Sequence, residues 1–341
     1  APTGCWAQSA GGYGDGVGTG PTGGDWLIED SAFLYNTSDG LDLLYHSLGG
    51  TVTLRRTVAR GNAGNQIKIA GAATLENVLA VGNCGFFEDQ PFTHNVDPCR
   101  ALGNTVALFP EAGDAITVVN STVAGEGDCL VTAECLGDGD CVGTESILLR
   151  NTLFQGGPQH GSDGDTTCLT WTSLSGDPFT MDHTLIHDVK GMPSPCPPQS
   201  QCAIDPGLVS GEMDAFDGRL TAASPAIDAG TSNLAPAVDL LGHARDSRPD
   251  VGAYEWRSYV YLPLMLRLGR PCRREGLSRM PRMGESKGTV VARLAAGRAA
   301  WKKPSTCGRI RFHANRVPWT RLTRQRSDGF PPNSKDRGPR E

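Results

Sequence analysis

Short stretches in which apolar and polar residues alternate recur along the first part of the chain. One runs from Trp26 to Asn36, a second from Val52 to Asn62, and a third from Thr74 to Asn83. Each contains a pair of small or β-branched residues and ends at an asparagine. Alternation with a period of two is the pattern of a β-strand that buries one of its faces. The pattern therefore predicts short strands that repeat along the chain.

The repeat fits a coil of parallel strands. The pairs begin at positions that lie 26, 21, 44, 30 and 32 residues apart, namely Ser31, Thr57, Val78, Thr122, Thr152 and Thr184. We interpret the interval of 44 residues as about two turns, and the longest intervals leave room for cysteine-rich loops. A repeat of about 22 residues is too short for a strand–helix–strand crossover but sufficient for one rung of a solenoid. We therefore predict an all-β, right-handed parallel β-helix.

Asn36, Asn62 and Asn83 fall at one turn position of this predicted coil. Asparagine tolerates the left-handed backbone conformation, and its side chain can form hydrogen bonds along a stack. We therefore expect the three side chains to lie above one another as a ladder.

The ladder predicts a cluster of charged side chains. Six residues after each asparagine come Asp42, Lys68 and Asp89, and equivalent positions on neighbouring rungs stack about 4.8 Å apart. Asp15 precedes Asp39 by 24 residues and Asp42 by 27, which is the spacing of one rung. We expect Asp15, Asp39 and Asp42 to converge from two rungs, with Lys68 on the third. The alternative without a functional role is a surface ion pair between Asp42 and Lys68, with little effect on stability.

Charge divides the chain into regions. Residues 1–256 contain 10 Lys and Arg against 32 Asp and Glu, whereas residues 257–341 contain 21 against 5. We predict a β-helix over 1–220, a C-terminal capping segment over 221–256 and a disordered basic tail over 257–341. An acidic body is unfavourable for binding nucleic acid.

The cysteines indicate an oxidising compartment. The chain contains 11 cysteines, several of which lie six residues apart in loops rich in glycine, aspartate and proline, and none has a zinc-site spacing. Disulfides that staple loops are therefore predicted. No apolar run approaches the roughly 18 residues that would span a membrane. We expect a secreted or bacterial cell-surface protein that is a monomer.

Two segments near the end of the acidic body resemble a family of surface proteins. Ser224–Gly230 and Asp239–Glu255 are similar to the C-terminal part of the choice-of-anchor β-helix proteins of bacterial surfaces. The resemblance implies a location and a cap for the coil, but no chemistry.

Two segments of the predicted coil resemble the family 9 pectate lyases. Asn36–Leu43 is similar to an Asp-Asp-Gly-Trp-Asp-Leu segment that supplies calcium ligands, and Gly64–Gly71 to a Gly-Asn-Gly-Phe-Lys-Leu-Gly-Gly segment that supplies the catalytic lysine. The resemblance implies Asp39 and Asp42 as calcium ligands and Lys68 as the base.

The same resemblance extends to the preceding rung, but it is incomplete. Asp15 matches the calcium ligand that comes from that rung. Ser38 stands where the family has another ligand aspartate, and Leu41 stands where it has tryptophan. These departures put the number of calcium ligands in question.

The leading functional hypothesis is a Ca²⁺-dependent polysaccharide lyase that cleaves a uronate-containing polymer, with Lys68, Asp42 and Asp89 as catalytic candidates. The net charge of residues 1–256 opposes binding of such a polyanion. A β-helix glycoside hydrolase acting on a neutral glucan or xylan is the alternative, with two of Asp39, Asp42, Glu88 and Asp89 as its acid and base. A non-catalytic glycan-binding surface module is the third.

Overall fold

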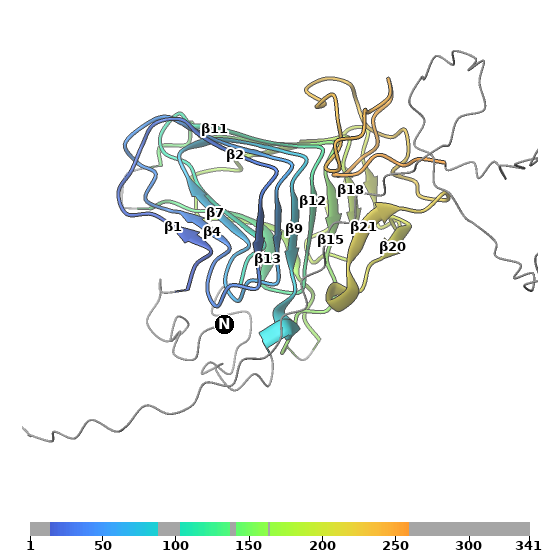
Figure 1. Cartoon of the computed structure of the whole chain (residues 1–341), viewed down its shortest axis with the longest axis horizontal. Helices are drawn as coiled ribbons and strands as arrows, with labels where there is room; N and C mark the ends of the chain where they lie inside the picture. Colours follow the sequence, from blue (N-terminus) through green and yellow to red (C-terminus); the bar gives the residue numbers. More distant parts are fainter. Residues whose placement is uncertain (1–13, 88–102, 137–140, 163, 259–341) are drawn as a thin grey trace, which may run out of the picture. The chain divides into compact units, whose positions relative to one another are not determined.

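The chain is a parallel β-helix. The computed structural model describes residues 14–87, 103–136, 141–162 and 164–258. These residues form three parallel sheets of six, six and seven strands, and each rung of the coil adds one strand to each sheet (Figure 1). The predicted fold is thus confirmed. In the described residues, no helix is long and apolar enough to cross a membrane.

Each strand pairs in parallel with the strands one rung before and one rung after it. The first sheet consists of β1 (Val17–Gly18), β4 (Leu41–Leu43), β7 (Ile67–Ala70), β10 (Val106–Phe109), β13 (Cys129–Ala133) and β16 (Cys168–Thr172). The second consists of β2 (Trp26–Glu29), β5 (Thr51–Arg55), β8 (Ala72–Glu76), β11 (Ala115–Val119), β14 (Ser146–Arg150) and β17 (Phe179–Asp182). The third consists of β3 (Ala32–Leu34), β6 (Val58–Arg60), β9 (Leu79–Gly82), β12 (Thr122–Gly125), β15 (Leu153–Gln155), β18 (Leu185–His187) and β19 (Gln201–Cys202).

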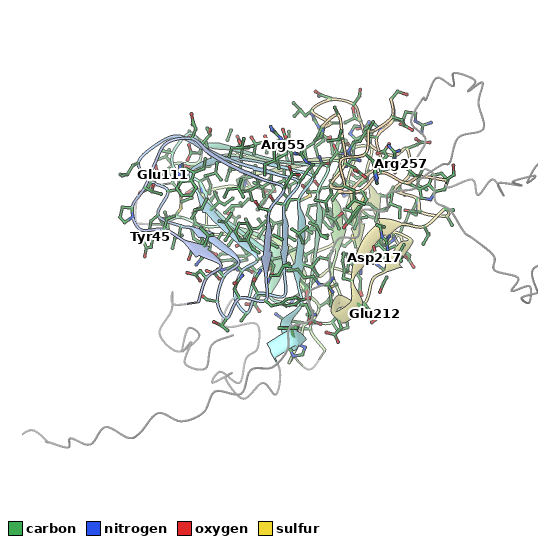
Figure 2. All side chains as sticks on the ribbon, viewed as in Figure 1. Tyr45, Arg55, Glu111, Glu212, Asp217 and Arg257 are labelled. Carbon is green, nitrogen blue, oxygen red and sulfur yellow. A yellow bond between two sulfur atoms is a disulfide. The ribbon has the colours of Figure 1, made fainter. Side chains whose placement is uncertain are left out.

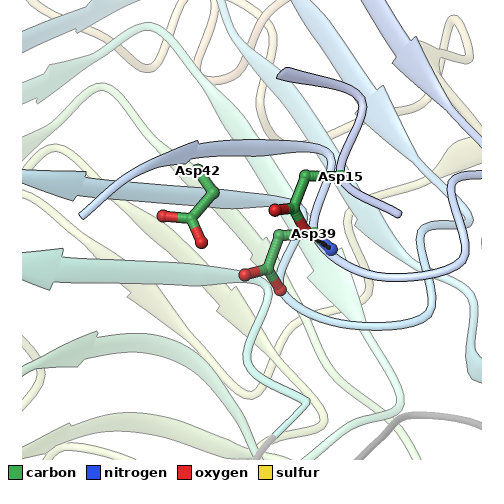
Figure 3. Close-up of side chains that lie close together, drawn as sticks. All are labelled: Asp15, Asp39 and Asp42. Carbon is green, nitrogen blue, oxygen red and sulfur yellow. Dashed lines mark hydrogen bonds between the residues drawn. The ribbon is translucent and has the colours of Figure 1, made fainter. Parts of the chain in front are cut away.

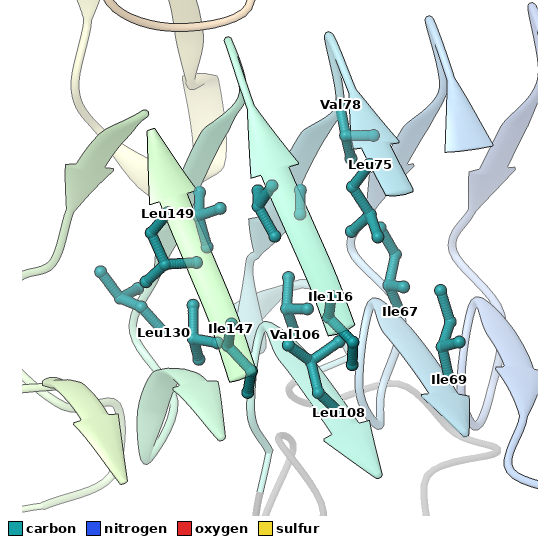
Figure 4. Packing of buried hydrophobic residues seen from close by; sticks show 14 of the residues in the cluster. Ile67, Ile69, Leu75, Val78, Val106, Leu108, Ile116, Leu130, Ile147 and Leu149 are labelled. Carbon is teal, nitrogen blue, oxygen red and sulfur yellow. The ribbon is translucent and has the colours of Figure 1, made fainter. Parts of the chain in front are cut away.

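The core is a continuous column of apolar side chains inside the coil. Alternate residues of each strand point inward, so that Ile67 pairs with Val106 on the first sheet and Ile116 with Ile147 on the second. All four side chains are at most 1% exposed and belong to one cluster (Figure 4). Removal of this apolar surface from water is the main term that stabilises the coil.

A two-residue corner joins the second sheet to the third in every rung. Its first residue has a positive φ of 45–52° throughout, at Asp30, Arg56, Asn77, Asn120, Asn151 and His183. Asparagine occupies this corner in three rungs because it adopts the left-handed conformation at lower cost than most residues. In five of the six rungs the first residue of the predicted pair follows directly, for example Ser31 after Asp30.

The predicted asparagine ladder is formed in part. Asn36 donates from Nδ2 to Asn62 Oδ1 at 2.7 Å, so these two side chains stack as expected. Asn83 is buried, but its Oδ1 has no hydrogen-bond partner in the described residues. None of the three has a positive φ. The left-handed asparagines belong instead to the corner column.

The interval of 44 residues was misinterpreted as two turns. β9 pairs directly with β12, so this stretch is a single rung that contains an insertion. The register also shows that Leu79 pairs with Thr122, so the residue equivalent to Val78 is Ser121. The register of β9 with β12 is kept across the insertion, so the added residues lengthen the rung without displacing these strands.

Disulfides staple the later rungs, as predicted. Cys129–Cys168 joins β13 to β16, whereas Cys135–Cys141 and Cys196–Cys202 each close a loop across six residues. The six-residue spacing seen in the sequence thus corresponds to local loops in two cases.

Residues 203–256 form a closing segment that packs along the third sheet. It contains an antiparallel pair, β20 (Leu208–Ser210) and β21 (Asp217–Leu220), and the 3-10 helix η2 (Met213–Ala215) (Figure 1). Phe216, Leu240 and Ala253 pack with Leu79 and Val81 of β9. The chain itself therefore covers part of the outer face of the third sheet.

Candidate active site

Strand register places Asp42 and Lys68 side by side on the first sheet. They are direct partners across β4 and β7, and their chain neighbours Leu41, Leu43 and Ile67 are fully buried in the core. Alternation along a strand therefore points Asp42 and Lys68 to the outer face. Lys68 Nζ donates to Asp42 Oδ2 at 3.0 Å.

Asp39 is the second partner of Lys68. It lies in the turn that precedes β4, is fully buried, and accepts from Lys68 Nζ at 2.6 Å. Its other oxygen, Oδ1, accepts from the backbone N of Asn65 at 2.7 Å and from Asn65 Nδ2 at 3.2 Å. These bonds hold the carboxylate in one orientation, because both oxygens have fixed donors.

Gly64 makes room for that carboxylate. A Cβ atom at position 64 would overlap Asp39 Oδ1, and Gly64 N donates to Ser38 O at 2.9 Å. The absence of a side chain at Gly64 is thus a condition for the position of Asp39. In the sequence, the signal for this role is the glycine directly before Asn65.

Asp15 completes a group of three carboxylates. It precedes β1 and accepts from the backbone N of Asp39 at 3.0 Å through Oδ1. One oxygen from each of Asp15, Asp39 and Asp42 lies within 4.8 Å of the other two, and the three side chains face one another (Figure 3). Residues from two rungs therefore converge at the place that their spacing predicted.

The remaining candidates follow β9 in the chain. Glu88 and Asp89 lie outside the described residues. The position that was expected to hold Asp89 beside Lys68 is occupied by Ala107 of β10. The count of six from Asn83 fails because the insertion separates β9 from the next strand of the first sheet.

The cluster carries more negative than positive charge. Three carboxylates face one ammonium, and the Lys68 and Asp42 side chains are only 15% and 14% exposed. Burial lowers the pKa of Lys68, but Asp39 and Asp42 outweigh burial and hold it above its ordinary value. Burial raises the pKa of Asp42, and the charge of Lys68 offsets this only in part. As it stands, the cluster keeps Lys68 protonated.

No family model matches the chain, and no curated protein matches it. A crystal structure of pectate lyase Pel9A is similar, at 16% sequence identity and a TM-score of 0.32, over 68% of this chain. The chain spans 65% of the length of that protein.

Proposed function

We propose that the chain is an extracellular polysaccharide-active β-helix protein and that the cluster at Lys68 is the active site of a calcium-dependent lyase. The observation that carries the proposal is a single lysine whose Nζ contacts Asp39 and Asp42 on the outer face of a sheet, beside the third carboxylate Asp15. Disulfides in the later rungs support the extracellular location.

The donor set suits a calcium ion. Ca²⁺ prefers oxygen ligands and takes several carboxylates at once. Asp15, Asp39 and Asp42 each offer one, and Asn65 Oδ1 close by is buried with no hydrogen-bond partner in the described part of the chain. A divalent cation would also balance the two negative charges that Lys68 leaves uncompensated. We therefore propose Asp15, Asp39 and Asp42 as the residues that would hold Ca²⁺.

Lys68 is the proposed general base. In β-elimination, its neutral amine would take the C5 proton α to the uronate carboxylate. The C–H electron pair would form a C4–C5 double bond, and the C4–O bond would break with its electron pair on the leaving oxygen, which would take a proton from water. When bound, Ca²⁺ would neutralise the substrate carboxylate and the charge that develops beside it. Asp42, through its contact with Nζ, would orient the amine.

The base has to lose its proton before it can act. Asp39 and Asp42 hold the pKa of Lys68 above its ordinary value, which disfavours the neutral amine. A cation bound to these carboxylates would lower the pKa of Lys68. We therefore expect the apparent pKa on the rising limb of the pH–rate profile to fall as calcium is raised.

A hydrolase remains the second candidate because residues 1–256 carry 32 acidic residues against 10 basic ones. This charge disfavours a polyanionic substrate but not a neutral glucan or xylan. Among the described residues, Asp39 and Asp42 are the candidates for the acid and base of the hydrolase. Glu88 and Asp89, which lie outside the described residues, are the further candidates. The hydrolase would release reducing ends without an unsaturated product.

Replacement of Lys68 tests the proposal. Lys68→Ala should lower turnover on a uronate polymer by about 10²–10⁴-fold, measured as ultraviolet absorbance of the unsaturated product. Calcium affinity, measured by calorimetry, should be preserved. The matched control is Lys190→Ala, because Lys190 is 64% exposed and forms a surface ion pair with Asp165. A Lys68→Ala protein with full activity that EDTA does not inhibit would exclude the lyase.

A further inference from the structure

A cavity lies between the later rungs of the coil and the closing segment. It has a volume of about 420 Å³ and opens where β15 and β18 end against the closing segment. Gln155 and His187 line it from the coil, whereas Asp205 and Glu212 line it from the closing segment. Small-molecule sites commonly have volumes of about 300–1,000 Å³, so this cavity is large enough for a ligand of one or two sugar rings.

The lining of the cavity is acidic. Glu126, Asp188, Asp205 and Glu212 contribute carboxylates, and the lining includes no lysine or arginine. Arg60 reaches the same region, but its guanidinium donates to the backbone carbonyls of residues 213, 214 and 216. The lining thus holds no lysine or arginine that would neutralise Asp188 or Glu212, whereas Glu126 accepts from Gly85 N and lies 4.0 Å from His160 Nδ1.

Hydrogen bonds determine which nitrogen of the neutral His187 imidazole carries the hydrogen. Gln155 is 8% exposed, and its Nε2 donates to Gly156 O at 2.8 Å, which sets the orientation of the amide. Its Oε1 then faces His187 Nδ1 at 3.1 Å, and an amide oxygen can only accept. Nδ1 must carry the hydrogen, so Nε2 of the neutral ring is left with a lone pair.

The rest of the wall is apolar. Pro158, Pro206, Leu208 and Met213 contribute carbon surface between the acceptors. A ligand that fits these groups has to present hydrogen-bond donors and positive charge on a compact body with carbon faces. Ca²⁺ does not fit as well, because these carboxylates do not form a group of ligand atoms as close as that of Asp15, Asp39 and Asp42.

We propose that this cavity binds an amino sugar through its protonated amine. The ammonium lies among the carboxylates of Asp188 and Glu212, a sugar hydroxyl donates to His187 Nε2, and the C–H face of the ring packs on Pro206 and Leu208. The proposal concerns a different part of the molecule from Lys68 and does not depend on the lyase.

Calorimetry on the full chain tests the proposal with three probes. These are the disaccharide of glucosamine, its N-acetylated form and 1,5-diaminopentane. The glucosamine disaccharide should bind at least about tenfold more tightly than either of the others, a difference of about 1.4 kcal/mol. Equal binding of the N-acetylated disaccharide would overturn the role of the amine, and equal binding of the diamine would overturn that of the sugar ring. Absence of binding would overturn the site.

Variants locate the binding. Glu212→Gln and Asp188→Asn should each weaken binding about three- to tenfold, as expected for loss of a partly screened ion pair. Both residues are exposed, and asparagine tolerates the positive φ of 49° at position 188, so the fold is preserved. Glu111→Gln is the matched control, since Figure 2 shows Glu111 and Glu212 on opposite sides of the molecule. Lys68→Ala should leave binding unchanged. Binding that neither cavity variant weakens, or that Glu111→Gln or Lys68→Ala weakens equally, would contradict the assignment.

Discussion

At the scale of single residues, the candidate active site depends on how tightly Asp39 is held. It has contacts with residues of the rungs before and after its own: Asp15 accepts from its backbone N, while Asn65 and Lys68 donate to its carboxylate. A group held from several sides is oriented before any ligand arrives, so binding does not have to order it. The same packing leaves no space for an added side chain at Gly64, next to the carboxylate.

Gly64 is the residue at which this tightness can be tested. Gly64→Ala would place a methyl group against Asp39 Oδ1, which we expect to displace the carboxylate and to cost about 1–3 kcal/mol of stability through overpacking. Calcium affinity should fall together with the melting temperature. Gly20→Ala is the control, because a Cβ there meets nothing within 4 Å. Unchanged calcium affinity in Gly64→Ala would show that Asp39 is not a ligand.

At the scale of elements, the corner between the second and third sheets sets the shape of each rung. Asn120 and Asn151 occupy it in successive rungs, and Asn151 Nδ2 donates to Asn120 Oδ1 at 3.0 Å. Asn151 also bonds the closing segment through Thr231, whose N donates to Asn151 Oδ1 at 2.8 Å. A single side chain therefore supports the turn, the stack and the docking of another segment.

Replacement of Asn151 separates these contributions. Asn151→Ala should lower the free energy of unfolding by about 3 kcal/mol, because buried partners lose their hydrogen bonds and alanine is strained at the φ of 50°. Asn151→Gly should cost less, since glycine adopts this conformation freely. Urea unfolding measures both, and the exposed Asn233→Ala serves as the control. Equal losses in the two variants would mean that backbone strain contributes nothing.

At the scale of the whole molecule, the closing segment contains a buried ion pair whose arginine also contacts the coil. Arg245 and Glu255 are 2.9 Å apart, and their side chains are only 2% and 6% exposed. Arg245 also donates to Asn77 Oδ1 at 2.8 Å, which ties the segment to the corner column. A buried pair of this kind is costly to break, because the remaining charge has no partner.

Arg245→Ala should therefore destabilise the protein by about 3–5 kcal/mol and make the closing segment sensitive to proteolysis. The contrasting control is Arg219→Ala, which removes a surface pair with Asp217 in which Arg219 is 59% exposed and should cost less than about 1 kcal/mol. Thermal unfolding and limited proteolysis measure the two effects. Similar small losses in both variants would show that apolar packing alone holds the segment.

The sequence by itself determined the fold and the meeting of four charged residues. Alternation identified the strands, and the rung spacing placed Asp15, Asp39, Asp42 and Lys68 together, because a strand that buries one face has little freedom of register. Both predictions were possible because the same pattern of apolar and polar residues recurs in each rung.

Only the tertiary structure decided what lies between and outside the rungs. The insertion after β9 put Ala107 rather than Asp89 beside Lys68, because an inserted loop has no period from which to count. The space left by Gly64, the protonation of Lys68 and the acidic cavity at Glu212 depend on groups brought together from distant parts of the chain. Burial and charge act between such groups through space, so the order of residues in the sequence does not reveal them.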